Sequence, residues 1–214
     1  MVKKRFSIKG LADFMAANAV KQRKIIRDYK YPDEDEAHAK IIYYRAARDV
    51  VTAYHLATKN RLWLDAEAAA LRALAEASPG MTRIRLENNA RAIEEYAKHF
   101  SGRKFEILSD ISLELVYGDV TITVRPDIHV RENGTEKIIK LEFSKDEPEK
   151  KIRDVISQGM FEAAVAKGMK LGSKQVLYLD VARGKEHKGA RLGARLAREI
   201  AASCANMSSI WNSI

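Results

Sequence analysis

Two short stretches place side chains that can bind metal ions and move protons near one another. "VRPDIHV" carries Asp127 and His129, and "TEKIIKLEFSK", a few residues later, carries Lys140 and Glu142. Two carboxylates on neighbouring strands can both reach one hard divalent cation through oxygen atoms. A lysine beside them could orient a water molecule or stabilise negative charge that develops on a phosphate. These residue types therefore point to metal-assisted chemistry on a phosphate ester.

The two stretches meet at Asn133-Gly134, which is the strongest short-range signal for a β-hairpin, since both central residues of a type I′ turn need positive φ. The register that follows pairs Glu132 with Thr135, Val130 with Lys137, Asp127 with Lys140, and Arg125 with Glu142. One face then forms a core face of Ile122, Val124, Pro126, Ile128, Val130, Ile139, Leu141 and Phe143. The other face carries Arg125, Asp127, His129, Lys140, Glu142 and Ser144. Asp127 and Glu142 are diagonal neighbours there, with Cβ atoms about 7 Å apart or less.

The same alternation is typical of a sheet that simply has one face in water, where Asp-Lys and Arg-Glu cross-strand pairs are common. His129 is consistent with both interpretations. It could contact the metal ligands or transfer protons, or it could simply be exposed to solvent. Helices that cover both faces of the sheet would favour the cleft. The hairpin alone leaves both interpretations open.

The surrounding sequence predicts the elements that position this hairpin. Apolar spacing, capping residues and Pro or Gly stops predict helices over 8–31, 33–60, 64–78, 82–100, 146–168 and 187–205. Period-two alternation over 110–143 predicts a three-stranded meander, and 174–182 predicts a fourth strand. We therefore expect an all-helical N-terminal extension (1–80) and an α/β core (81–214) in the order α-β-β-β-α-β, followed by the last helix.

At this point the chain resembles the PD-(D/E)XK nuclease superfamily, over roughly residues 81–203. The resemblance lies in Pro126-Asp127 on the second strand, in Glu142-Phe143-Ser144 on the third, and in the order of elements. It implies a restriction-endonuclease-like core with a mixed sheet flanked by helices. It also implies that Asp127 and Glu142 bind Mg²⁺ or Mn²⁺.

The resemblance extends to supporting residues and also departs from the pattern. The branch similar to RecB and lambda exonuclease adds a glutamine on the helix after the third strand, where Gln158 stands, and an acid on the preceding helix, where Glu94 or Glu95 would serve. The lysine of the motif is replaced by Ser144. Lys140, two residues before Glu142, points to the same face and could take its role.

The charge of the chain favours an anionic partner. Its 214 residues carry a formal net charge of +9, and DNA is the partner that we expect first. The last predicted helix supplies a candidate phosphate-contacting stripe of Lys185, Lys188, Arg191, Arg195 and Arg198, although a solvated helix face would look the same.

The remaining composition bounds the setting. The single cysteine, Cys204, excludes an internal disulfide, and no apolar run approaches the roughly 20 residues that cross a bilayer. We therefore expect a cytoplasmic protein with no membrane association.

Three functions follow as expectations. The first is a Mg²⁺- or Mn²⁺-dependent nuclease that processes DNA, with Asp127, Glu142, Lys140 and Gln158 as catalytic residues and Asp127, Glu142 and Glu95 as metal ligands. The second is a catalytically degenerate relative that binds nucleic acid without cleaving it. The third is a module whose helical first half docks a protein partner.

Overall fold

A computed structural model describes residues 4–33, 35, 43–189 and 194–214. The helices in this part of the chain are α1 (Ile8–Ala16), α2 (Ala19–Lys30), α4 (Arg45–Leu56), α5 (Arg61–Glu76), α6 (Gly80–His99), α7 (Lys150–Ala166) and α8 (Ala194–Ser213). The strands are β1 (Lys4–Ser7), β2 (Glu106–Ile107), β3 (Leu113–Tyr117), β4 (Val120–Val124), β5 (Ile128–Glu132), β6 (Thr135–Glu142), β7 (Val176–Asp180) and β8 (Lys185–Lys188). Two 3₁₀ turns, η1 (Ser173–Gln175) and η2 (Val181–Arg183), flank β7.

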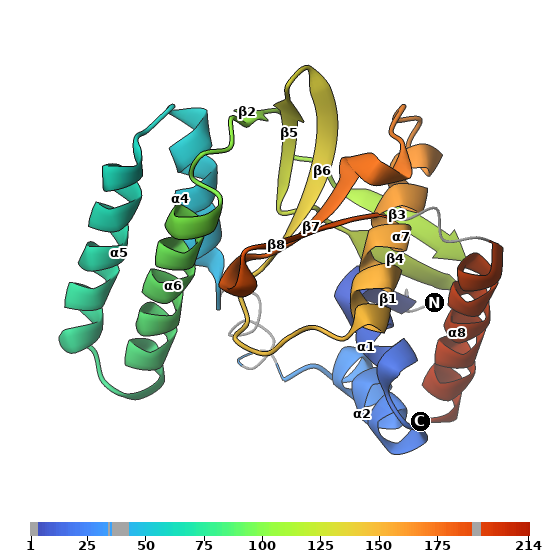
Figure 1. Cartoon of the computed structure of the whole chain (residues 1–214). Helices are drawn as coiled ribbons and strands as arrows, with labels where there is room; N and C mark the ends of the chain where they lie inside the picture. Colours follow the sequence, from blue (N-terminus) through green and yellow to red (C-terminus); the bar gives the residue numbers. More distant parts are fainter. Residues whose placement is uncertain (1–3, 34, 36–42, 190–193) are drawn as a thin grey trace.

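The strands form two sheets. The larger sheet has the order β2-β5-β6-β7-β8, and its pairs are antiparallel except for β6 and β7, which run parallel with α7 between them in the sequence. The smaller sheet has the order β1-β4-β3, with β1 parallel to β4. Figure 1 shows α4, α5 and α6 on one side of the larger sheet, and α7 with the smaller sheet on the other.

The larger sheet is apolar on both faces because each face packs against a separate core. One face contributes Ile128, Val130, Ile139, Leu141, Leu177 and Leu179 to a core that is closed by α4, α5 and α6. The other contributes Ile138, Val176 and Tyr178 to a core that is closed by the smaller sheet and by α1, α7 and α8. A sheet covered on both faces loses the simple inside–outside alternation. Polar side chains on it therefore need a partner.

The hairpin register predicted from Asn133-Gly134 is confirmed. Asn133 has φ of 51° and Gly134 of 74°, the positive values that a type I′ turn requires. The ladder pairs Glu132 with Thr135 and Val130 with Lys137, as expected.

The predicted three-stranded meander was wrong, because the strand drawn through Pro126 is interrupted there. Proline has no N–H to donate to a ladder, so β4 ends at Val124 and β5 begins at Ile128 in the other sheet. The predicted core face is accordingly divided between the two cores. Arg125, which was expected opposite Glu142, lies between the strands and outside both.

The first eighty residues are mainly helical, but not entirely so, and the prediction of an all-helical extension was wrong at its start. Lys4–Ser7 forms β1, and the helix expected over 8–31 is two helices. Asn18 starts the second of these, since its side chain accepts a hydrogen bond from the backbone N–H of Lys21 at 3.0 Å. Within the span 33–60, where one helix was expected, α4 covers Arg45–Leu56, and residues 34 and 36–42 lie outside the described part. The boundary at residue 80 remains a prediction.

The C-terminal part also differs from the expectation. Lys185–Lys188 is strand β8 and not the start of the last helix, and α8 runs on to Ser213 through the tail that the sequence did not place. Trp211 anchors this extension, because its ring lies 5.7 Å from that of Phe6 and is nearly buried. None of the described helices combines the length and apolarity needed to cross a membrane.

The buried His55 on α4 makes the stability of the fold depend on pH. Its Nε2 lies 2.7 Å from the Tyr96 hydroxyl, and burial, assisted by the charge of Arg103, lowers the pKa of His55 to about 4. The unfolded chain binds a proton as the pH falls below about 6.5, whereas the folded chain resists it until about 4. The contribution is therefore complete above pH 6.5 and is lost as the pH falls toward 4.

We expect the free energy of unfolding to fall by on the order of 2–3 kcal/mol between pH 7 and 4.5 because of His55. Urea denaturation at both pH values measures this loss. His55→Gln should show a smaller difference between the two pH values, whereas His99→Gln, which leaves His55 intact, should retain it. Equal pH dependence in parent and His55→Gln would contradict the assignment.

Candidate functional site

The Asp127 carboxylate lies where the chain passes from one sheet to the other. Its Oδ2 accepts a hydrogen bond from the backbone N–H of Leu141 at 2.8 Å, and its own N–H donates to the Ile139 carbonyl at 2.8 Å. In a continuous strand, a backbone carbonyl would have accepted the hydrogen bond from the Leu141 N–H of β6. Here the Asp127 side chain accepts it instead. This fixes the carboxylate beside the far end of the hairpin.

Two cations neutralise this carboxylate. The Lys140 Nζ lies 2.8 Å from Oδ2, and the Arg48 Nε, from α4, lies 3.0 Å from Oδ1. The side chain of Asp127 is only 5% exposed. The pairing of Asp127 with Lys140 is the one that the hairpin register had predicted. Arg48 was not predicted, because only the tertiary structure brings α4 to this point.

Glu142, at the end of β6, is held by different partners. Its Oε1 accepts from the Ser144 N–H at 3.0 Å, and its Oε2 accepts from the Tyr178 hydroxyl at 2.9 Å. Burial, reinforced by the charge of Glu142, raises the pKa of Tyr178, so this hydroxyl remains a donor. Burial also raises the pKa of the Tyr44 phenol, against the opposing charge of Arg91.

A further buried carboxylate, Asp180, ends β7 directly opposite Glu142 in the parallel ladder. It is fully buried and pairs with the guanidinium of Arg183 at 3.0 and 3.1 Å. Sequence reasoning missed Asp180 and Tyr178. The available signal was an acid that ends the otherwise apolar strand "VLYLD", a position where charge is unusual.

Arginine donors gather around the same end of the larger sheet. The Arg91 side chain donates to the Phe143 carbonyl at 3.1 Å, and Arg183 donates to the Lys145 carbonyl. The Nε of Arg91 is buried and has no hydrogen-bond partner, whereas the buried Nε of Arg48 faces Asp127 Oδ1 at 3.0 Å. Buried donors of this kind suit an incoming anion such as a phosphate.

Gln158, predicted as a catalytic residue, is directed to another part of the molecule. Its amide donates to Glu162 at 2.7 Å, and Glu162 accepts from the Tyr117 hydroxyl on β3 at 2.9 Å. Gln158 is 7% exposed, and its Oε1 has no hydrogen-bond partner. Its contacts therefore join α7 to the smaller sheet, and its catalytic role remains a prediction.

The two acids proposed on the preceding helix also have other partners. Glu94 accepts two hydrogen bonds from Arg72, and Glu95 lies 3.2 Å from the His99 Nε2 and 3.6 Å from the Lys98 Nζ. These contacts do not join Glu95 to Asp127 or Glu142. Its role as a third metal ligand remains a prediction.

The His129 side chain makes contacts within the fold. Its ring is 9% exposed, with Nδ1 2.9 Å from the Ser109 carbonyl and Nε2 2.8 Å from Glu136. It therefore links β5 to the segment before β3 and to β6.

The basic residues predicted on the last helix do not all lie there. Lys188 is on β8, 3.6 Å from Glu186. Arg195 and Arg198 are exposed on α8, and Arg195 pairs with Glu199 at 2.9 Å. Arg191 lies outside the described residues. The stripe is therefore described only at Arg195 and Arg198.

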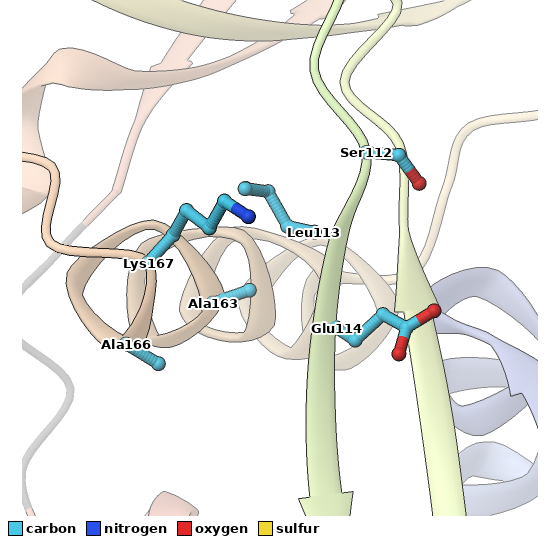
Figure 2. A pocket seen from close by; sticks show the side chains of 6 residues that line it. All are labelled: Ser112, Leu113, Glu114, Ala163, Ala166 and Lys167. Atoms are coloured by element: carbon cyan, nitrogen blue, oxygen red, sulfur yellow. The ribbon is translucent and has the colours of Figure 1, made fainter.

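A pocket of about 440 Å³ lies away from these carboxylates, between the start of β3 and the end of α7. Figure 2 shows the Lys167 amine reaching toward Leu113, while the Glu114 carboxylate points away from α7. Glu114 is paired with Arg5. The pocket thus offers one amine among both polar and apolar neighbours, and neither Asp127 nor Glu142 lines it.

The donor set fits Mg²⁺ or Mn²⁺ in type. Within the described residues, no three His, Cys, Asp or Glu side chains are grouped to hold a metal ion. Mg²⁺, however, is commonly held by one or two carboxylates and completes its shell with water and phosphate oxygens. Asp127 and Glu142 could therefore hold such an ion once Arg48 or Lys140 moved aside.

No protein-family model matches the chain, and no curated protein matches it.

We expect Lys140→Met to lower the free energy of unfolding by about 1–3 kcal/mol, because it leaves the buried Asp127 with one cation fewer. Adding Asp127→Asn to this variant should restore part of the loss, as measured by urea denaturation. Lys24→Met is a matched control, since Lys24 pairs with Asp28 on exposed α2 and should cost about 0.5 kcal/mol or less. Equal losses in Lys140→Met and Lys24→Met would show that the Asp127 contact adds little.

Proposed function

We propose that this protein is a Mg²⁺- or Mn²⁺-dependent nuclease-like enzyme that hydrolyses phosphodiester bonds in DNA. The observation that carries the proposal is the contact of Lys140 with Asp127 at the end of the hairpin where Glu142 also stands. The pairing unites, on one strand pair, the acid after proline and Lys140, which would take the role of the lysine that Ser144 replaces in the PD-(D/E)XK motif.

The order of elements supports the same proposal. In chain order α6, β2, β5, β6, α7 and β7 follow an α-β-β-β-α-β sequence, and their strands are neighbours in the larger sheet. The β3–β4 hairpin is then an insertion after the first strand that builds the smaller sheet with β1. On this proposal the first strand of the core would be β2, and not the segment that the sequence suggested.

The chain's own residues would divide the work as follows. Asp127 and Glu142 would hold the ion, whose chemistry is to polarise the phosphodiester and favour a deprotonated water. Lys140, released from Asp127, would balance charge on the phosphate oxygens. The buried Nε donor of Arg91 would orient the phosphate from the side of α6, and Arg48, once released from Asp127, would do so from α4.

We expect Mn²⁺-dependent cleavage of a DNA oligonucleotide by the parent, and a loss of about 100-fold or more in both Asp127→Asn and Glu142→Gln. Both variants keep a hydrogen-bond acceptor for Leu141 N or Tyr178, so they should remain folded by circular dichroism. Asp49→Asn is the matched control, because Asp49 lies next to Arg48 on α4 but pairs with Arg45 on the surface. Cleavage by Asp127→Asn at the parent rate would refute the catalytic assignment.

A second candidate, a nuclease-fold protein that binds nucleic acid without cleaving it, is favoured by one specific observation. Arg48 and Lys140 already neutralise Asp127, and Ser144 stands where the motif has lysine. In such a protein, Asp127 would serve only its contacts within the fold and would no longer bind a metal ion.

For this candidate we expect DNA affinity that falls steeply between about 50 and 200 mM salt, with no product when Mn²⁺ is added. Fluorescence anisotropy measures the affinity. Arg195→Ala combined with Arg198→Ala should lower the salt dependence by roughly one unit of slope per lost phosphate contact. Lys98→Ala, an exposed lysine on α6, is the control. A DNA affinity that does not change with salt concentration would contradict both candidate functions.

A further inference from the structure

Helix α5 is apolar on its outer face as well as on its inner one. Its inner residues Leu64, Ala68 and Ala75 are buried, and the helix packs against α6 and α4. The opposite side is exposed and carries Leu62, Ala66, Ala69, Ala73 and Ala77, which recur at intervals of three and four and so form one stripe. Surface helices normally turn polar residues outward.

Large side chains add to this surface. Leu62, on the stripe, is 74% exposed, and Leu74, which flanks the stripe together with Ala70, is 56% exposed. Figure 1 shows α5 at the outer edge of the molecule, with α4 and α6 between it and the sheets. The helix has 16 residues, so the uncovered apolar face is about 24 Å long. An apolar face of this length on the outside indicates a docking surface.

A row of charged residues borders the stripe, and the order of their signs indicates which partner could bind there. Arg61, Asp65, Arg72 and Glu76 are separated by four, seven and four residues, which keeps them on the same side of the stripe. All four are exposed, and their signs alternate along the helix as plus, minus, plus, minus. This order is self-complementary when it is read in the opposite direction.

We propose that α5 is the contact surface of a homodimer, in which two copies of the helix pack antiparallel across a two-fold axis. With the axis between residues 68 and 69, Arg61 faces Glu76 of the second copy and Asp65 faces Arg72 of the second copy. The symmetry repeats both contacts, so the row forms four attractive pairs.

The same register also fits the apolar stripe. Leu62 of one copy comes level with the space between Ala73 and Ala77 of the other, so a large side chain meets small ones. Alanines along the remainder allow the helix axes to approach to about 8 Å. A parallel pair would instead place each charged row beside the Ala70–Leu74 side of the other copy, where Glu67 is the one charged residue and the alternating row is not matched.

The experiment uses two charge-reversal variants. Each should associate weakly with itself, and the two should associate well with each other. Both are made in the outer pair, because Arg72 of the inner pair binds Glu94 within its own chain at 2.6 Å, whereas Arg61 has only a longer contact of 4.0 Å with Asp65. Between identical copies, Arg61→Glu brings two carboxylates together at each outer contact, and Glu76→Arg brings two guanidinium groups together there. We expect each variant to self-associate about tenfold more weakly than the parent in sedimentation equilibrium. An equimolar mixture should associate nearly as tightly as the parent, because each chain then meets opposite charges in both outer contacts.

Arg195→Glu is the matched control. Arg195 is also an exposed arginine with an acid four residues later, but it lies on α8, at the other side of the molecule. It should dimerise as the parent does, and circular dichroism should show that all variants keep their helix content. A parent that stays monomeric at concentrations on the order of 100 μM overturns the proposal, as does a mixture that associates no better than its components. None of these residues contacts Asp127 or Glu142, so nuclease assays remain an independent test.

Discussion

The fold depends on one carboxylate that takes the place of a backbone acceptor. Pro126 interrupts the strand, and Asp127 restores the interrupted contact by accepting from the Leu141 N–H through its side chain. The chain can therefore leave the smaller sheet at Val124 and enter the larger one at Ile128 without an orphaned donor. Because the carboxylate is buried, it needs cations, and Lys140 and Arg48 supply them. The same atoms that join the sheets thus form the centre of the candidate site.

Arginines from three elements then anchor the end of the larger sheet. Arg48 reaches it from α4, Arg91 from α6 and Arg183 from η2, and the last two bind the carbonyls of Phe143 and Lys145 just beyond β6. Glu142 is fixed beside them by Tyr178, which belongs to the opposite core. The polar end of the sheet is consequently held from both faces. Positive charge at this end suits a phosphate.

Local signals in the sequence predicted the hairpin well, and distant contacts escaped them. Asn133-Gly134 determined the register and the Asp127–Lys140 contact, since both depend on neighbours along the chain. β8 could not be recognised, because "KEHK" contains no apolar residue. β1 is four residues long, and its partner β4 lies more than a hundred residues away. Arg48, Arg91 and Tyr178 entered the site only through tertiary packing, and the metal roles of Asp127 and Glu142 remain predictions.

The pairing of β1 with β4 has a consequence for synthesis on the ribosome. Phe6 lies between β4 and the ring of Trp211, and Lys4 contacts both Asp119 and Ser208. Strand β1 therefore has no partner strand until more than a hundred further residues have been translated. The core around Phe6 can form completely only after α8 has left the exit tunnel. The α4–α6 helices need no such delay to find each other. Nascent chains should thus expose a short, basic and unpaired strand until β4 has been synthesised.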